Sequence, residues 1–199
     1  MMKRTFHVLL FCLNIIYSFE GIAQKTVWKI DDLHSKIGFS VTHMMVSETE
    51  GTFDSYEAEL KSDANDFSDL KVDFTIKTAS INTRNERRDN HLKAEDFFDA
   101  KKYPEITFTS SSIEKGEGSL LYITGDLTIR DVTKQVTFEG DHKGTIKKDG
   151  FGLTRAGLFI KITINRQDFG IAYNDKTEAG ELFLSNDVDV LCKLSIVKN

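Results

Sequence analysis

Three histidines with acidic neighbours are the residues of this sequence most suited to carry chemistry. His34, His43 and His91 could combine with Asp89 or Asp96 as metal ligands, because imidazole nitrogens and carboxylate oxygens are common zinc donors. These histidines lack the short spacing, such as His-x-x-x-His, that places two ligands side by side. We therefore predict no metal site and expect each histidine to be a hydrogen-bonded residue of the core or rim.

Nucleophilic catalysis is the next chemistry to consider, because His34 and Ser35 are adjacent. Adjacent residues of a strand point to opposite faces, so these two cannot form a nucleophile and base pair. The sequence has no Gly-x-Ser-x-Gly motif, no phosphate-binding loop and no dinucleotide-binding glycine motif. We predict no catalytic residues and no cofactor. The alternative is an enzyme that modifies a bound ligand through His43, His91 or an arginine.

Arginines near the middle of the chain could bind a ligand head group. Arg84, Arg87 and Arg88 lie close together, and a guanidinium can grip an anionic or carbonyl group through two hydrogen bonds. The alternative is an ion pair that holds one element against another, and we favour that for two pairs. These are Arg88 with Asp89 and Arg166 with Asp168.

The elements that position these residues are predicted by an alternation of apolar and polar residues with a period of two. In a strand, alternate side chains face opposite sides, so each run buries one face. Turn residues such as Gly116, Asp149-Gly150 and Asn174-Asp175 separate the runs, and most connections are too short for a crossover helix. About eight antiparallel strands must close into a barrel or pack as a sandwich. The apolar positions are Ile37, Phe39 and Val41; Val72, Phe74 and Ile76; Ile106 and Phe108; Leu127 and Ile129; Val136 and Phe138; Leu158, Ile160, Ile162 and Ile164; and Val188, Val190, Cys192, Leu194 and Ile196.

One segment interrupts this pattern. Residues Asn85–Lys101 are charged, rich in helix formers and free of β-branched residues, which predicts one or two short helices. Thr83 or Asn85 could cap the first helix. Phe97 and Phe98 could close one end of a barrel and contact a ligand there, or they could be a hydrophobic plug only.

The N-terminus has the pattern of a cleaved export signal. Lys3 and Arg4 precede an apolar run over residues 5–19, and small residues two apart end at Ala23. We predict cleavage after Ala23, so that residues 1–23 are a signal peptide and residues 24–199 form one domain. A membrane anchor is the alternative, but the run is too short to span a bilayer comfortably. We expect a periplasmic or secreted protein with no membrane segment after cleavage.

Charge and cysteine content exclude two further classes. The chain has a formal net charge of −5, and loss of Lys3, Arg4 and Glu20 with the signal removes a net +1 and leaves −6. Such a balance argues against general nucleic-acid binding, which needs a basic face. The mature chain retains only Cys192, so it cannot form an internal disulfide.

Seven motifs in order resemble the YceI-like family of exported proteins. The resemblance covers residues from Trp28 to about Leu194. The motifs are Trp28-Lys-Ile-Asp31 with His34-Ser35 and Phe39-Ser-Val-Thr-His43-Met44; Gly51-Thr-Phe53; Ser80-Ile81-Asn-Thr83; Arg88-Asp89-Asn-His91-Leu92 with Asp96-Phe-Phe98; Tyr103-Pro104-Glu-Ile-Thr-Phe108; Gly125-Asp-Leu-Thr-Ile129 with Val132-Thr-Lys134; and Asn165-Arg166 with Asp168-Phe-Gly170.

The resemblance implies an all-β fold: an eight-stranded antiparallel lipocalin-like barrel with one or two short helices at one end. It also implies an apolar interior that binds an amphiphilic lipid with a long tail, such as a polyisoprenoid, a quinone-like lipid or a fatty-acid derivative. An eight-stranded barrel can also be filled by side chains, so a solid structural or interaction module remains an alternative. A homodimer is a further possibility. Residues 151–154 and 172–184 vary in the family, so the resemblance does not give the ligand's identity.

The residues that would contact such a ligand are the inward side chains of the strands and the two rings that close the end. His43 continues the face of Ile37, Phe39 and Val41 and could donate a hydrogen bond to a head group. The predicted ligand-binding residues are Phe39, Val41, His43, Phe53, Phe74, Ile76, Phe97, Phe98, Phe108, Leu127, Phe138, Leu158 and Ile160.

Overall fold

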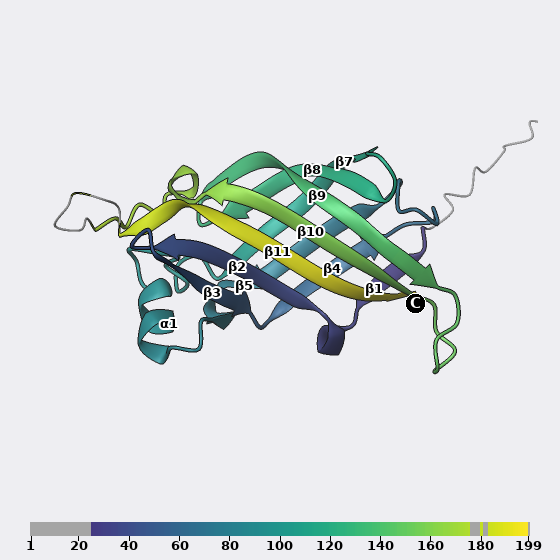
Figure 1. The fold of residues 1–199 in the computed structure, drawn as a ribbon, viewed down its shortest axis with the longest axis horizontal. Coiled ribbons are helices and arrows are strands. Elements are labelled where there is room, and N and C mark those ends of the chain that lie inside the picture. The colour runs from purple at the N-terminus through teal and green to yellow at the C-terminus, as the bar shows by residue number, and fades with distance from the viewer. Residues whose placement is uncertain (1–24, 176–179, 181–182, 199) are drawn as a thin grey trace, which may run out of the picture.

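The computed structural model describes residues 25–175, 180 and 183–198, so the predicted signal peptide lies outside the described residues. It confirms the predicted antiparallel barrel (Figure 1). The apolar positions that alternate in the sequence lie in strands, as their period requires. The strands are β1 (Val27–Ile30), β2 (Lys36–His43), β3 (Ser47–Phe53), β4 (Tyr56–Lys61), β5 (Lys71–Lys77), β6 (Ile81–Asn82), β7 (Glu105–Lys115), β8 (Leu120–Ile129), β9 (Val132–Ile146), β10 (Arg155–Asn165) and β11 (Leu184–Lys198).

The strands form a closed ring with eight positions. The hydrogen-bonded order is β1-β4-β5-β7-β8-β9-β10-β11, and β11 pairs with β1 to close it. All pairs are antiparallel, and directly opposite residues share a face of the sheet. Phe39 is opposite Val190 and Ile160 is opposite Cys192, so apolar side chains from neighbouring strands point into the barrel together.

Three of the eight positions consist of two strand halves. The short 3-10 helix η1 (Asp32–His34) separates β1 from β2, and η2 (Thr78–Ser80) separates β5 from β6. Asp54 and Ser55 separate β3 from β4. At one end of the barrel β1 pairs with β4, and towards the other end β2 pairs with β3. These bends let the first strands curve around the barrel.

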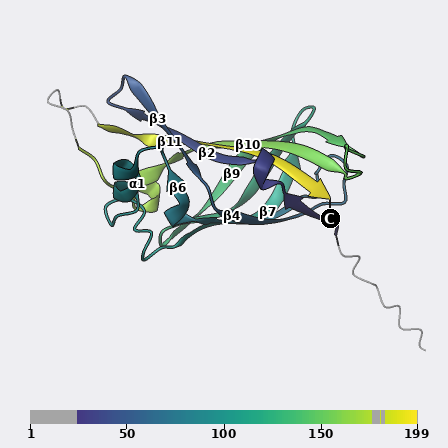
Figure 2. The same ribbon diagram turned by 90° about the horizontal axis from the view of Figure 1, so that it is seen from below.

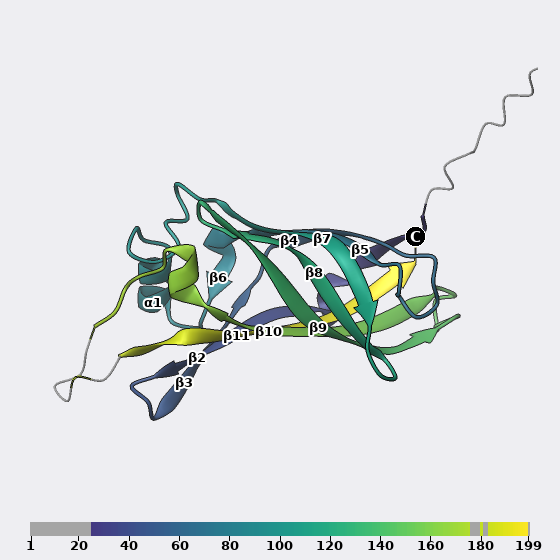
Figure 3. The same ribbon diagram turned by 90° about the horizontal axis from the view of Figure 1, so that it is seen from above.

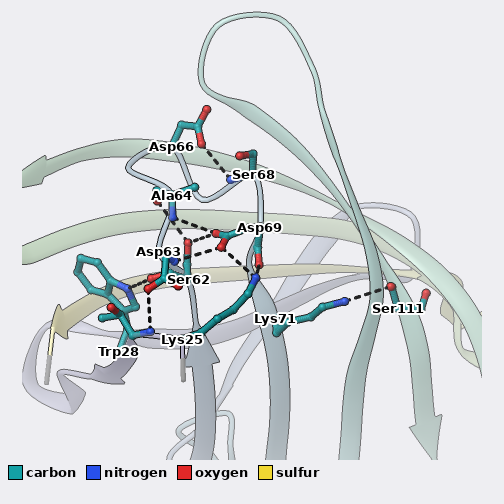
Figure 4. Close-up of polar contacts among 11 residues, drawn as sticks. Lys25, Trp28, Ser62, Asp63, Ala64, Asp66, Ser68, Asp69, Lys71 and Ser111 are labelled. Atoms are coloured by element: carbon teal, nitrogen blue, oxygen red, sulfur yellow. Dashed lines mark hydrogen bonds and ion pairs between the residues drawn. The ribbon is translucent and has the colours of Figure 1, made fainter. Parts of the chain in front are cut away.

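One end of the barrel, called the sealed end below, is closed by the loop of residues 62–70. Phe67 and Leu70 of this loop are fully buried, and the Trp28 ring packs against Phe67 with 5.1 Å between centroids. Asp69 fixes the loop. It accepts hydrogen bonds from Ser62 Oγ at 2.6 Å, Lys25 Nζ at 2.9 Å, and the backbone amides of Asp63 at 3.2 Å and Ala64 at 3.1 Å (Figure 4).

The opposite end, called the covered end below, carries the one α-helix among the described residues. Helix α1 spans Glu86–Leu92, and the Asn85 side chain caps it by accepting a hydrogen bond from Arg88 N at 3.1 Å. The prediction of helix over Asn85–Lys101 was too long, because turns follow Leu92. Adjacent residues of a helix point about 100° apart. The turns instead allow Phe97 and Phe98 both to face the barrel interior.

Within the described residues, no helix is long and apolar enough to cross a membrane.

The covered end also contains the 3-10 helix η3 (Arg166–Phe169), which follows β10. Arg130, in the tight turn between β8 and β9, donates to Phe97 O at 3.1 Å and to Gly170 O at 2.8 Å. These bonds tie the segment after α1 to the barrel rim.

Candidate binding cavity inside the barrel

An apolar cavity of about 180 Å³ lies inside the barrel. Its wall combines inward side chains of the strands with Leu92 of α1 and the two rings that follow the helix. Within the described part of the chain, the polar residue types on the wall are Thr107, Arg166 and Cys192, and the other lining side chains are hydrocarbon. The cavity has room for roughly a dozen groups the size of water or methylene.

Most of the predicted ligand-binding residues lie on this wall. Eleven of the thirteen line the cavity, and they come from elements between residues 39 and 160. Whether they contact a ligand stays a prediction. The eleven are Phe39, Val41, Phe53, Phe74, Ile76, Phe97, Phe98, Phe108, Leu127, Phe138 and Ile160.

The remaining two predicted residues lie elsewhere. Leu158 points inward on β10 but is buried in the core, with 1% of its surface exposed, beyond the end of the cavity. His43 ends β2, and its ring packs edge-on against Phe183 with 4.8 Å between centroids. The side of a strand that a residue faces follows from the sequence, whereas its position along the barrel axis does not.

Part of the wall lies outside the predicted set of residues. The inward face of β11 contributes five side chains, four of which belong to the alternating run already recognised. Arg166 and Ile171, in and after η3, gave no periodic signal. The wall residues outside the predicted set are Ile37, Gly38, Leu60, Val72, Leu92, Ile106, Thr107, Ile123, Ile129, Ile162, Ile164, Arg166, Ile171, Leu184, Val188, Val190, Cys192 and Leu194.

Two glycines let aromatic rings lie against the wall. Gly51 is the cross-strand partner of Phe39, and a Cβ atom at Gly51 would overlap the Phe39 ring and crowd Thr83. A Cβ atom at Gly125 would overlap Thr109 O and the Phe108 ring in the same way. Because each ring occupies the space over a glycine, it takes up less of the barrel interior.

Among the residues that the structure describes, Arg166 is the one charged residue on the wall. Only 4% of its surface is exposed, and burial lowers the pKa of its guanidinium, which still remains protonated. All of its nitrogens donate hydrogen bonds to the chain around η3 and the start of β11. The acceptors are Ser185 O at 2.9 Å, Ile171 O at 2.8 Å, Tyr173 O at 2.6 Å, and Leu184 O and Asn186 Oδ1 both at 3.3 Å.

The two predicted arginine and aspartate pairs are not formed as predicted. Asp168 pairs with Lys134 at 3.1 Å, while Arg166 binds backbone carbonyls. Arg88 and Asp89 both bind Thr83. Arg88 donates to Thr83 Oγ1 at 2.7 Å, and Asp89 accepts from the Thr83 hydroxyl at 2.6 Å and from its amide at 2.8 Å. The helix is therefore held to the barrel through a threonine.

The three candidate histidines have different neighbours. His34 Nδ1 lies 2.8 Å from Asp31 Oδ2, and His91 Nε2 lies 2.6 Å from Asp96 Oδ2. The His91 ring also packs edge-on against Phe97 and Tyr173 at the covered end. The described residues contain no group of three or more histidine, cysteine or acidic side chains placed to hold a metal ion.

Cys192 lines the cavity on β11, opposite Ile37. Burial raises the pKa of its thiol to about 12, because a thiolate would lose its hydration in the apolar interior. The thiol therefore stays protonated at neutral pH and is a poor nucleophile.

A second, polar cleft of about 330 Å³ lies where the two halves of the first strands bend apart. Asp32, Lys36 and Asp54 are among the residues that line it. Ile37 and Phe53 belong to the lining of both cavities, so their side chains separate the polar cleft from the apolar interior.

Comparisons with known proteins agree with this architecture. A UPF0312 protein of Staphylococcus aureus is 39% identical over 163 residues, which cover 82% of this chain and 92% of the relative. A crystal structure of a Campylobacter jejuni YCEI protein is 33% identical, has a TM-score of 0.68, and covers 79% of this chain and 90% of that one. BcnA of Burkholderia cenocepacia, at 24% identity and a TM-score of 0.71, shares the fold over 83% of this chain and 98% of its own.

The description of the family model that matches residues 28–196 is "YceI-like domain". This match spans the whole closed barrel, from β1 to the end of the inward face of β11. The chain therefore belongs to the YceI-like family.

Proposed function

We propose that this protein binds an amphiphilic lipid with a long apolar tail inside its barrel, and carries or sequesters it outside the cytoplasmic membrane. The observation on which this rests is the apolar cavity inside a closed barrel. A solid barrel would leave no such space. A structural neighbour from Saccharophagus degradans is described as a polyisoprenoid binding domain; at 17% identity it shares the fold, so the proposed ligand class depends on this chain's own cavity.

The shape of the cavity favours a slim chain over a compact ligand. Lining residues on β11 run from Leu184 to Leu194, which corresponds to about 33 Å along the strand. Each methylene transferred from water to this wall contributes about 0.8 kcal/mol, while association costs roughly 4–15 kcal/mol. Tight binding therefore requires a tail that fills most of the cavity, with the polar head group at the covered end.

The polar groups of the wall support binding without covalent chemistry. Arg166 uses its guanidinium to hold backbone carbonyls, and the Cys192 thiol stays protonated. Neither group has a neighbouring base or nucleophile among the wall residues that the structure describes. We therefore favour a carrier or scavenger over an enzyme that acts on the bound amphiphile, and we propose export through the predicted signal peptide.

Native mass spectrometry of the mature chain, purified without detergent, tests the proposal. Wild-type protein should carry an adduct that organic solvent extracts and that has the mass of an apolar lipid. Val190→Asp places a charge on the wall and should abolish the adduct, since an unpaired charge in an apolar cavity is strongly unfavourable. Val190→Thr keeps the shape, adds one hydroxyl and should weaken binding.

Leu191→Asp is the matched control, because Leu191 is the next residue on β11 and is exposed on the outside of the barrel. It should retain the adduct, and thermal unfolding should show that Val190→Thr is folded. An empty wild-type protein that also fails to bind a dansyl-labelled geranylgeranyl probe would contradict the proposal. The same spectra report whether the chain is a monomer or a homodimer.

A further inference from the structure

The tip of the β2–β3 hairpin has an unusual turn. Val46 N donates to His43 O at 3.3 Å, so Met44 and Met45 are the central residues of a tight turn. Both have positive φ, 51° and 61°, which is the pattern of a type I′ turn. Asn-Gly is the preferred pair there, because a Cβ atom strains the left-handed conformation. Two methionines are therefore a poor choice for the turn alone.

The same turn exposes three consecutive apolar side chains. Met44, Met45 and Val46 are 38%, 62% and 86% exposed. Methionine side chains are flexible and adapt to irregular apolar surroundings such as lipid. These residues therefore have a strained backbone conformation and exposed apolar side chains in the folded chain. This combination indicates that their apolar surface serves a contact outside the barrel.

This hairpin lies at the covered end and extends beyond the barrel (Figures 2 and 3). Met44 N donates to Phe183 O at 2.8 Å, and the His43 ring packs on Phe183. The next residue, Leu184, lines the cavity. The apolar tip is thus joined through one residue to the cavity wall, at the end that α1 and the Phe97 ring cover.

We propose that Met44, Met45 and Val46 insert into a lipid membrane and hold the covered end against it, so that a ligand can pass between the bilayer and the cavity. This inference rests on the proposed function, because it gives the route by which the lipid is exchanged. The insertion is apolar rather than electrostatic, since the mature chain has a net negative charge and Glu48 and Glu50 lie near the tip. Binding should therefore depend little on salt and should not require anionic lipid.

The test is the double variant Met44→Asn/Met45→Gly, which installs the preferred pair for this turn. It should be at least as stable to heat as the wild type. Co-sedimentation with phosphatidylcholine vesicles should fall by about tenfold, because two apolar side chains no longer enter the bilayer. The rate at which a dansyl-labelled geranylgeranyl probe moves from these vesicles to the protein should fall in parallel.

Phe151→Ser is the matched control. Phe151 is 88% exposed on the connection between β9 and β10 at the sealed end, so its loss should leave vesicle binding and transfer unchanged. The inference is overturned if the double variant binds vesicles and takes up the probe as fast as the wild type, or if only Phe151→Ser impairs transfer. Equilibrium binding of the probe without vesicles separates the two proposals: its absence in the wild type contradicts the proposed function itself.

Discussion

Phe39 shows how a single backbone position controls the free space in this barrel. Its ring lies over Gly51 on the neighbouring strand and thereby leaves the centre of the barrel open. The same arrangement recurs for Phe108 over Gly125. At the residue scale, the cavity therefore depends on where aromatic rings rest as much as on which side chains are apolar.

Gly51→Ala should reduce the space for a ligand. The new Cβ atom would overlap the Phe39 ring, which must then swing into the cavity. We expect the affinity for the dansyl-labelled geranylgeranyl probe to fall by roughly tenfold and the free energy of unfolding to fall by about 1–3 kcal/mol, as for other overpacked cores. Gly150→Ala, in open space on a surface turn, is the control. Unchanged probe affinity in a folded Gly51→Ala variant would refute this account of the cavity.

At the scale of elements, the loop of residues 62–70 buries an aromatic ring on a residue whose backbone is strained. Phe67 has a φ of 58°, yet it is fully buried beneath the barrel end. Its packing against Trp28 and the hydrogen bonds of Asp69 hold it there. Trp28 Nε1 also donates to Ser62 O at 3.1 Å, so strand β1 and the loop are joined directly.

Asp69 should make the stability of the sealed end sensitive to acid. Burial alone would raise the pKa of its carboxyl group, but hydrogen bonds from Ser62, Lys25 and two backbone amides outweigh that effect and lower it. A carboxyl group whose pKa is lower in the folded state than in the unfolded chain stabilises the fold at pH values above its unfolded-state pKa. That contribution is lost as the pH falls through the folded-state value. Acid should therefore weaken the wild-type barrel.

Asp69→Asn removes this pH dependence and leaves buried donors with a poorer acceptor. We expect the free energy of unfolding at neutral pH to fall by about 1–3 kcal/mol, and to change less than in the wild type between neutral pH and about pH 3. Urea unfolding at the two pH values measures this. Asp73→Asn, at an exposed position on β5, should match the wild type. Equal acid sensitivity of Asp69→Asn and wild type would argue against the role of Asp69.

At the scale of the whole molecule, closure of the sheet decides what the protein can hold. Eight strands give a barrel just wide enough to be filled by side chains or to hold one slim ligand. Here the core fills the sealed end, where Leu158 and Ile196 are buried, and the cavity occupies the part towards α1. One molecule thus combines a packed core with an apolar cavity.

Export is a prediction about the chain that still carries the predicted signal peptide. When the gene is expressed with its signal, the protein from the extracytoplasmic fraction should begin at Gln24, as measured by intact mass and N-terminal sequencing. Leu9→Arg should leave the uncleaved chain in the cytoplasm, since a charge interrupts the apolar run. A conservative Leu9→Ile control should be exported normally. Recovery of exported protein that still contains residues 1–23 would contradict cleavage after Ala23.

Much of the fold could be predicted because its physical cause is local. Alternation with a period of two assigns each side chain of β2, β5, β7, β8, β10 and β11 to the inside or the outside, and turn residues mark where the strands end. The cap at Asn85 follows from its own side chain. Family motifs spread over the whole domain then indicated one closed barrel.

The tertiary structure alone decided how the inward side chains share the interior. Leu158 and Ile160 lie on the same face of β10, yet only Ile160 reaches the cavity, because depth along the barrel depends on how the strands are staggered at closure. Arg166 binds carbonyls from a segment that the fold brings to it, rather than Asp168 two residues away. Sequence periodicity is a property of a single strand, whereas the size and position of the cavity depend on how all the strands of the closed barrel pack together.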